Sequence, residues 1–177
     1  MLSSRSGAAV VQPPPQRAPR NLSRRAAAFW ISAWWPVALG IAVIALESTE
    51  WLGANYTSGP FRWLFEHLFG RVPDARWNLI HHYIRKTGHF VGYGLIGLAW
   101  LRAWRMSLPR CRFFFDILFA ILGTALIATC DEWHQAFLPN RTSSPRDVLL
   151  DCSGATVLCL LAYLFVKLFR PERLARA

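Results

Sequence analysis

The residues that could do chemistry in this chain are nine ionisable or hydrogen-bonding side chains in or beside long apolar segments. They are Lys86, His89, Tyr93, Asp131, Glu132, Gln135, Arg141, Asp147 and Asp151. The spacing i, i+3, i+7 places the first three on one face of a helix, and Asp147 and Asp151 share a face at i, i+4. A carboxylate within a membrane helix costs roughly 2.5–3.5 kcal/mol on insertion scales, so chains keep such groups where they pair or where they function.

Three interpretations fit these side chains, and the residues alone leave them open. Cationic Lys86, His89 and Arg141 suit the recognition of phosphate or carboxylate, as in an anionic lipid headgroup or a lipid-linked cell-wall intermediate. In the second interpretation, Lys86 and Arg141 neutralise the four carboxylates in a purely structural ion-pair network. In the third, the same carboxylates and histidines serve an intramembrane hydrolase or transferase.

Two more specific sites lack a supporting motif. A metal site could draw on His89, His134 and the carboxylates, but no metal spacing such as H-E-x-x-H is present, so we expect no metal and no other cofactor. Nucleophilic catalysis would need Ser143 or Ser144 beside a histidine, and no nucleophile motif surrounds either serine. No catalytic residue is therefore assigned.

Four nearly uncharged stretches must position these side chains. They are residues 26–46, 88–104, 113–129 and 148–168. Stretches of about 20 apolar residues match the hydrocarbon core of a bilayer. We therefore predict an all-α, polytopic membrane protein with four transmembrane helices. Because successive spans alternate in direction, the start of the second, the end of the third and the start of the fourth lie at one level.

The charge distribution predicts the orientation. The net charge is +10, but the cations do not gather on one face as in a nucleic-acid-binding domain, so we expect no nucleic-acid partner. Thirteen of the 20 Lys and Arg residues lie on one side of the predicted spans: before the first, at the end of the second or between it and the third, and at the end of the fourth or after it. The positive-inside rule then puts both termini in the cytoplasm and the nine side chains at the extracytoplasmic face of the inner membrane.

The flanking segments divide the chain into a membrane domain and two tails. Residues 1–25 are rich in Ser, Pro and Arg and are predicted to form a disordered cytoplasmic tail. Residues 26–170 form the membrane domain, and residues 171–177 a cytoplasmic C-terminal tail. Cys130 and Cys152 both fall near the extracytoplasmic level, where a disulfide between them could form.

The long first extracytoplasmic loop contains a further predicted helix. It starts at Gly59-Pro60, and its apolar residues follow helical spacing, with polar residues on the opposite side. The apolar side comprises Phe61, Leu64, Phe65, Leu68 and Phe69, and the polar side Arg62, Glu66 and His67. Such a segment is predicted to lie in the membrane interface as a short amphipathic helix. In the second stretch, Gly88, Gly92 and Gly97 favour close packing between helices.

Two segments resemble the motifs of VanZ-like membrane proteins. The first is Arg85-Lys86-Thr87-Gly88-His89-Phe90, followed by Tyr93. The second is Asp131-Glu132-Trp133-His134-Gln135, followed by Pro139-Asn140-Arg141, then Asp147 through Asp151 and Gly154. Glu47-Ser48-Thr49 also resembles the end of the first span in some members, and the resemblance covers roughly residues 35–168. Asn140 departs from the common Gly of the family, and Asn tolerates the left-handed turn that Gly would supply.

The resemblance implies a four-helix membrane domain of the cell envelope, in a family named for a protein linked to teicoplanin resistance. It also implies that the matched positions among the nine form the characteristic site. We expect membrane lipids as partners, with a lipid-linked envelope intermediate as the more specific candidate. Nothing in the sequence requires an oligomer, and the family name does not supply a reaction.

Overall fold

In a computed structural model, the described residues (22–49, 54–138 and 143–169) form five helices and no strand. The helices are α1 (Leu22–Glu47), α2 (Ala54–Phe69), α3 (Asp74–Ser107), α4 (Phe113–Gln135) and α5 (Pro145–Phe169). The all-α prediction is confirmed. Three helices, α1, α4 and α5, are long and apolar enough to cross a membrane. The crossing by residues 88–104 of α3 stays a prediction, since His89, Arg102 and several glycines make that segment less apolar.

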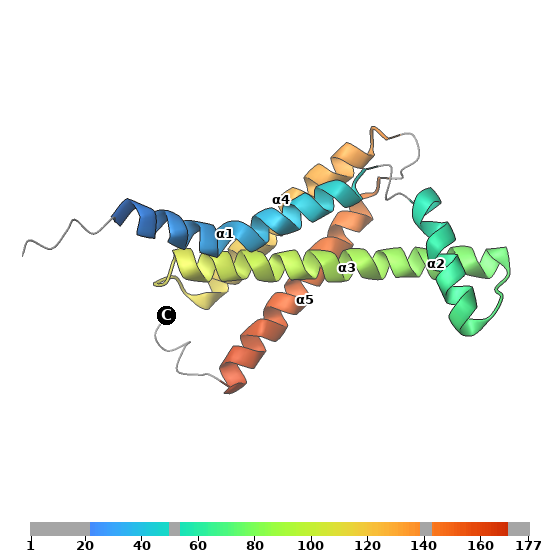
Figure 1. Cartoon of the computed structure of the whole chain (residues 1–177). Coiled ribbons are helices and arrows are strands. Elements are labelled where there is room, and N and C mark those ends of the chain that lie inside the picture. The colour runs from blue at the N-terminus through green and yellow to red at the C-terminus, as the bar shows by residue number, and fades with distance from the viewer. Residues whose placement is uncertain (1–21, 50–53, 139–142, 170–177) are drawn as a thin grey trace, which may run out of the picture.

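Helix α3 is the centre of the bundle. It packs most extensively against α5, then against α4 and α1 (Figure 1). Its 34 residues correspond to about 50 Å at 1.5 Å per residue, which exceeds the ~30 Å hydrocarbon core. The N-terminal part of α3 extends beyond the crossing with α5, and α2 folds against it there (Figure 1).

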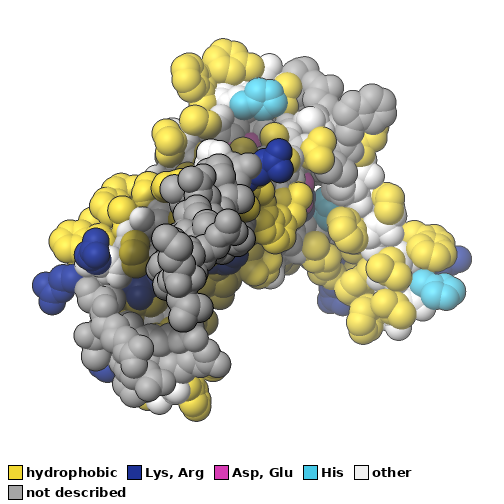
Figure 2. Space-filling model, turned by 60° about the vertical axis from the view of Figure 1, so that its left-hand side comes forward, with side chains coloured by type: hydrophobic (Ala, Val, Ile, Leu, Met, Phe, Trp, Pro, Cys, Tyr) yellow, Lys and Arg dark blue, Asp and Glu magenta, His cyan; other side chains and the backbone are white. Residues whose placement is uncertain are grey.

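The burial pattern is the reverse of that in a soluble protein. Alanines such as Ala33, Ala120 and Ala155 are fully buried, whereas Leu126 is 64% exposed. Hydrophobic side chains cover much of the visible face in Figure 2. Small residues between helices and large apolar residues outside are typical of helices packed in lipid, so the apolar helices indicate a multi-pass membrane protein.

The crossing of α3 and α5 depends on small residues. A Cβ at Gly154 would meet the backbone carbonyl of Phe90, and a Cβ at Gly97 would lie 2.7 Å from the Ala155 Cβ. The packing role predicted for Gly97 is thus confirmed. For Gly88 and Gly92 the prediction is wrong, because no atom lies within 4 Å of a Cβ added at either position. Both glycines face away from α5 and border open space.

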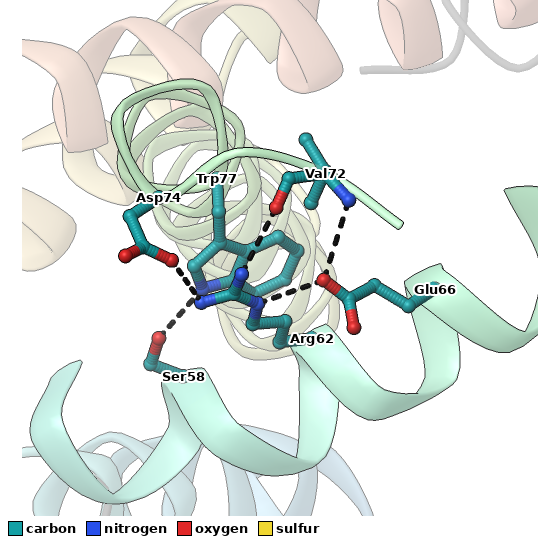
Figure 3. A network of polar contacts seen from close by, with 6 residues as sticks. All are labelled: Ser58, Arg62, Glu66, Val72, Asp74 and Trp77. Carbon is teal, nitrogen blue, oxygen red and sulfur yellow. Dashed lines mark hydrogen bonds and ion pairs between the residues drawn. The ribbon is translucent and has the colours of Figure 1, made fainter. Parts of the chain in front are cut away.

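Helix α2 is joined to the start of α3 by a polar network (Figure 3). The Arg62 guanidinium donates to Glu66 Oε1 at 2.9 Å, to Asp74 Oδ1 at 2.7 Å and to the Val72 carbonyl at 2.9 Å. Gly70, with φ of 88°, ends α2 in the left-handed conformation that glycine adopts without strain. Arg62 therefore closes the turn between the two helices.

Two boundaries differ from the predictions. Helix α2 begins at Ala54, before Gly59-Pro60, and α1 begins at Leu22, so residues 22–25 are helical rather than part of a disordered tail. Residues 1–21 and the C-terminal tail 171–177 lie outside the described residues. All four cysteines are free thiols, and Cys130 and Cys152 are not joined.

Candidate functional site

The predicted site residues meet at one end of the bundle, where α4 ends and α5 begins. We call eight of them the polar cluster: Lys86, His89 and Tyr93 of α3, Asp131, Glu132 and Gln135 of α4, and Asp147 and Asp151 of α5. The ninth, Arg141, lies outside the described residues. The eight are linked by pairwise contacts between helices rather than arranged around one central cavity.

Two contacts cross from α3 to α5. Lys86 forms an ion pair with Asp147. One turn further along both helices, His89 Nδ1 lies 3.5 Å from Asp151 Oδ1, whose side chain is 1% exposed. The face of α3 that carries Lys86 and His89 thus meets the face of α5 that carries Asp147 and Asp151. The crossing at Gly154 holds the two helices close together.

A third set of contacts joins α3 to α4. The Tyr93 hydroxyl donates to Asp131 Oδ2 at 3.0 Å, and Gln135 Nε2 donates to the same oxygen at 2.9 Å. All three side chains are buried. Only the Tyr93 bond crosses between the helices and holds α4 against α3. Gln135 lies one turn along α4 from Asp131 and supplies the second donor within the same helix.

Glu132 links the end of α4 to the start of α5. Its Oε2 accepts a hydrogen bond of 2.8 Å from the backbone N–H of Ser144, the residue before α5. A carboxylate at this position satisfies a backbone donor and lies near the positive end of the helix dipole. From the sequence, Ser144 was considered as a candidate nucleophile, and its contact with Glu132 was not predicted.

One contact was not predicted at all. Ser48 Oγ and His134 Nδ1 share a hydrogen bond of 2.9 Å, which ties the end of α1 to the last turn of α4. Ser48 lies in the segment 47–49, and the resemblance of this segment to the family was the sequence feature that pointed to this position. The contact brings a fourth helix to the polar cluster.

The polar cluster holds more acids than cations. Its four carboxylates face only Lys86 and His89 among the described members. Asp131 Oδ1, both Asp151 oxygens and His89 Nδ1 are buried without a hydrogen-bond partner in the described part of the chain. At 3.5 Å the His89–Asp151 pair is too long for a strong hydrogen bond. Buried polar atoms are normally satisfied, so these orphaned atoms require an explanation.

Two grooves flank α3 at this end. The first, which we call the α3–α5 groove, has a volume of about 680 Å³ and includes Lys86, Ser144, Arg146 and Asp147 in its lining. The second, the α1–α3 groove, has about 530 Å³ and reaches His89. The deeper members Tyr93, Asp131, Glu132, Gln135 and Asp151 line neither groove.

The described residues contain no group of three or more His, Cys, Asp or Glu arranged to hold a metal ion. Within the part of the chain described here, neither Ser143 nor Ser144 forms a hydrogen bond with a histidine. The arrangement can therefore pair charges, orient the His89 ring and present Lys86 at a groove.

Comparison with known proteins gives one match. The family model described as VanZ/LLP1 matches residues 28–167, which covers most of the chain and all eight members of the polar cluster. No match was found among curated proteins or among solved structures.

Proposed function

The chain belongs to the VanZ/LLP1 family, and from that premise we propose that it binds an anionic amphiphile at the extracytoplasmic face of the bacterial inner membrane. The ligand is an anionic membrane lipid or a lipid-linked cell-wall intermediate, and its headgroup occupies the α3–α5 groove. The protein crosses the membrane four times with both termini in the cytoplasm. A role in resistance to glycopeptides such as teicoplanin would follow from binding the cell-wall intermediate.

The arrangement of α3 supports the fourth crossing. Residues 88–104 lie against α4 and α5, two of the helices apolar enough to span a membrane. The proposed interfacial position of α2 is supported by its outward face, where Trp63 is 69% and Phe69 is 74% exposed. Aromatic residues of this kind favour the membrane–water boundary.

The observation that carries the proposal is the charge of the α3–α5 groove. Lys86 and Arg146 supply two cations against the single carboxylate of Asp147, and His82 lies beside them. The groove also reaches Ser144 at the N-terminus of α5, where the helix dipole favours negative charge. The lining also includes the aromatic rings of Tyr83 and Phe90 and the apolar Leu150, which suits an amphiphile rather than a free ion.

Native mass spectrometry with added phosphatidylglycerol tests this proposal. We expect bound phosphatidylglycerol on the wild type and a several-fold loss in Lys86→Ala and Arg146→Ala. The matched control is Arg76→Ala, an exposed cation of α3 outside the groove. The proposal is overturned if the groove variants retain as much lipid as the control, or if phosphatidylcholine binds equally well.

One observation favours the hydrolase or transferase as a second candidate. The buried Asp151 carboxylate stands behind His89, and the His89 ring lines the α1–α3 groove. A histidine oriented by a carboxylate can act as a general base. This candidate requires that His89→Gln abolishes turnover of a lipid substrate while the thermal stability of the protein stays unchanged.

The structural ion-pair network is the third candidate, and the packed carboxylates favour it. Asp131 and Glu132 have hydrogen-bond partners and line neither groove. If this were their only role, then Lys86→Ala would reduce stability and leave lipid binding intact.

A further inference from the structure

The α1–α3 groove is a second site, on the face of α3 opposite to the α3–α5 groove. At about 100° per residue, Lys86 and Phe90 point to one side of α3, whereas Gly88 and Gly92 point to the other. The walls of the α1–α3 groove are apolar, and they come from both helices. They include Leu39, Val43 and Ile44 of α1 and Ile84, Leu95 and Ile96 of α3.

The floor of this groove is made by glycines that pack against nothing. Neither Gly88 nor Gly92 has an atom within 4 Å of where a Cβ would lie. By contrast, a Cβ at Gly40 of α1 would lie 2.9 Å from Ile96 Cγ1. The two helices are thus in contact at Gly40 and Ile96 and leave a channel beside Gly88 and Gly92.

The two ends of the groove differ in polarity. Glu47, Arg85 and His89 lie at the end near the polar cluster, together with Thr57 of α2. From Arg85 to Ile96 the groove follows α3 for eleven residues, or about 16 Å. This is about half of the ~30 Å hydrocarbon core, so the groove has the depth of one leaflet.

The shape and polarity of the groove suit one hydrocarbon chain with a polar head. Its walls are apolar and its floor is open over the depth of one leaflet. At the polar end, a zwitterionic headgroup is complementary to the opposite charges of Arg85 and Glu47.

We propose that the α1–α3 groove holds one acyl chain of a membrane phospholipid, with its end at Gly40 and Ile96 and its headgroup beside Arg85 and Glu47. This site is separate from the headgroup site of the α3–α5 groove and does not depend on it. The bound chain would lie against the His89 ring, next to the buried Asp151 pair.

Photo-crosslinking tests the proposal. The full-length protein is placed in nanodiscs that contain phosphatidylethanolamine with a diazirine midway along one acyl chain, and labelled peptides are mapped by mass spectrometry. We expect several-fold more label at Val43, Leu95 and Ile96 than at Leu126 and Leu164, which are exposed but lie outside the groove. Equal labelling of both sets overturns the proposal, as does a crosslinked second copy in place of lipid.

Groove-filling variants make the test specific. Gly92→Leu places a side chain in the open groove and is expected to reduce the label at Val43 and Ile96 to the level at Leu126. Gly59→Leu is the matched control, because Gly59 also has nothing within 4 Å but lies outside the groove. If Gly92→Leu does not fold, Val43→Trp fills the groove from α1. Unchanged labelling in a folded groove variant overturns the proposal, whatever happens to phosphatidylglycerol binding in Lys86→Ala.

Discussion

The bundle buries carboxylates at both ends, in two different ways. At one end, which we call the Arg105 end, Asp116 is fully buried. Its Oδ2 accepts a hydrogen bond of 2.9 Å from Arg105, and its Oδ1 has no hydrogen-bond partner in the described part of the chain. The Arg105 guanidinium also lies 4.9 Å above the Phe113 ring. At the other end, the four carboxylates of the polar cluster face one lysine and one histidine among the described members, and several of their oxygens have no partner there.

The difference indicates different roles. One acid and one cation in good geometry, surrounded by aromatic side chains, are what a structural ion pair requires. A surplus of acids over cations beside two grooves is costly for stability, and such sites persist where they function. The Arg105 end therefore serves as an internal reference for what a purely structural contact looks like in this protein.

The largest expected effect is at the Arg105 end. Arg105→Ala leaves the Asp116 carboxylate buried without its cation, so we expect the free energy of unfolding to fall by about 3–5 kcal/mol. Reversible unfolding in mixed micelles measures this change. If the free energy of unfolding falls by less than about 1 kcal/mol, the pair is not structural and the two ends of the bundle do not differ in this way.

The crossing between the two ends is expected to be the next most sensitive position. Gly154→Ala places a Cβ against the Phe90 carbonyl, which cannot move aside, and should cost about 1–3 kcal/mol. Gly92→Ala is the matched control and should change stability by no more than about 0.5 kcal/mol, because its Cβ enters open space. Equal costs for the two variants would contradict the described packing of α3 on α5.

At the polar-cluster end, Asp151→Asn is expected to leave stability unchanged or to raise it by about 1 kcal/mol, because it removes a buried charge with unsatisfied oxygens. The thermal unfolding midpoint in detergent reports the effect. A loss comparable to that of Arg105→Ala would mean that the two ends are alike and that the polar cluster is structural.

The smallest effect concerns pH and the turn between α2 and α3. The hydrogen bond from Arg62 holds the pKa of the Glu66 carboxyl below its ordinary value of 4.5, helped by the Val72 N–H. A carboxyl with a lowered pKa in the folded state stabilises the fold above its unfolded pKa, and this contribution is lost as the pH falls through the folded pKa. The protection of residues 66–74 against hydrogen exchange, relative to the intrinsic exchange rate at each pH, should therefore fall below about pH 4.5 in the wild type.

Glu66→Gln is the control for the pH experiment. The amide does not titrate, so the protection factors of this variant should lack the acid-dependent fall. If the pH dependence of exchange is the same in the wild type and in Glu66→Gln, then ionised Glu66 does not stabilise this turn.

Local periodicity explains why much of the site was predictable. The spacing of Lys86, His89 and Tyr93 fixes a common face on any helix, and alternation of the spans brings that face level with Asp131 and Asp151. All-helical structure and the family followed from the same residues. These features depend only on positions along the chain.

The remaining features depend on how each helix is rotated against its neighbours. Sequence spacing does not show which side of α3 packs against α5. Gly88 and Gly92 were therefore predicted to pack there, although the glycines in contact with α5 are Gly94 and Gly97. The Ser48–His134 contact and the division of the site between two grooves likewise follow from tertiary packing. The start of α2 was missed because Gly59-Pro60 suggested a helix start, whereas the helix continues through both residues.

The most direct test of the comparison is the stabilisation that phosphatidylglycerol confers. A ligand at one hundred times its Kd adds about 2.7 kcal/mol to the free energy of unfolding. We predict that this gain is lost in the double variant Lys86→Ala, Arg146→Ala and is retained in Arg105→Ala, although Arg105→Ala starts from a lower stability. A gain that persists in the double variant, or that disappears equally in both proteins, would contradict a binding site at the polar-cluster end.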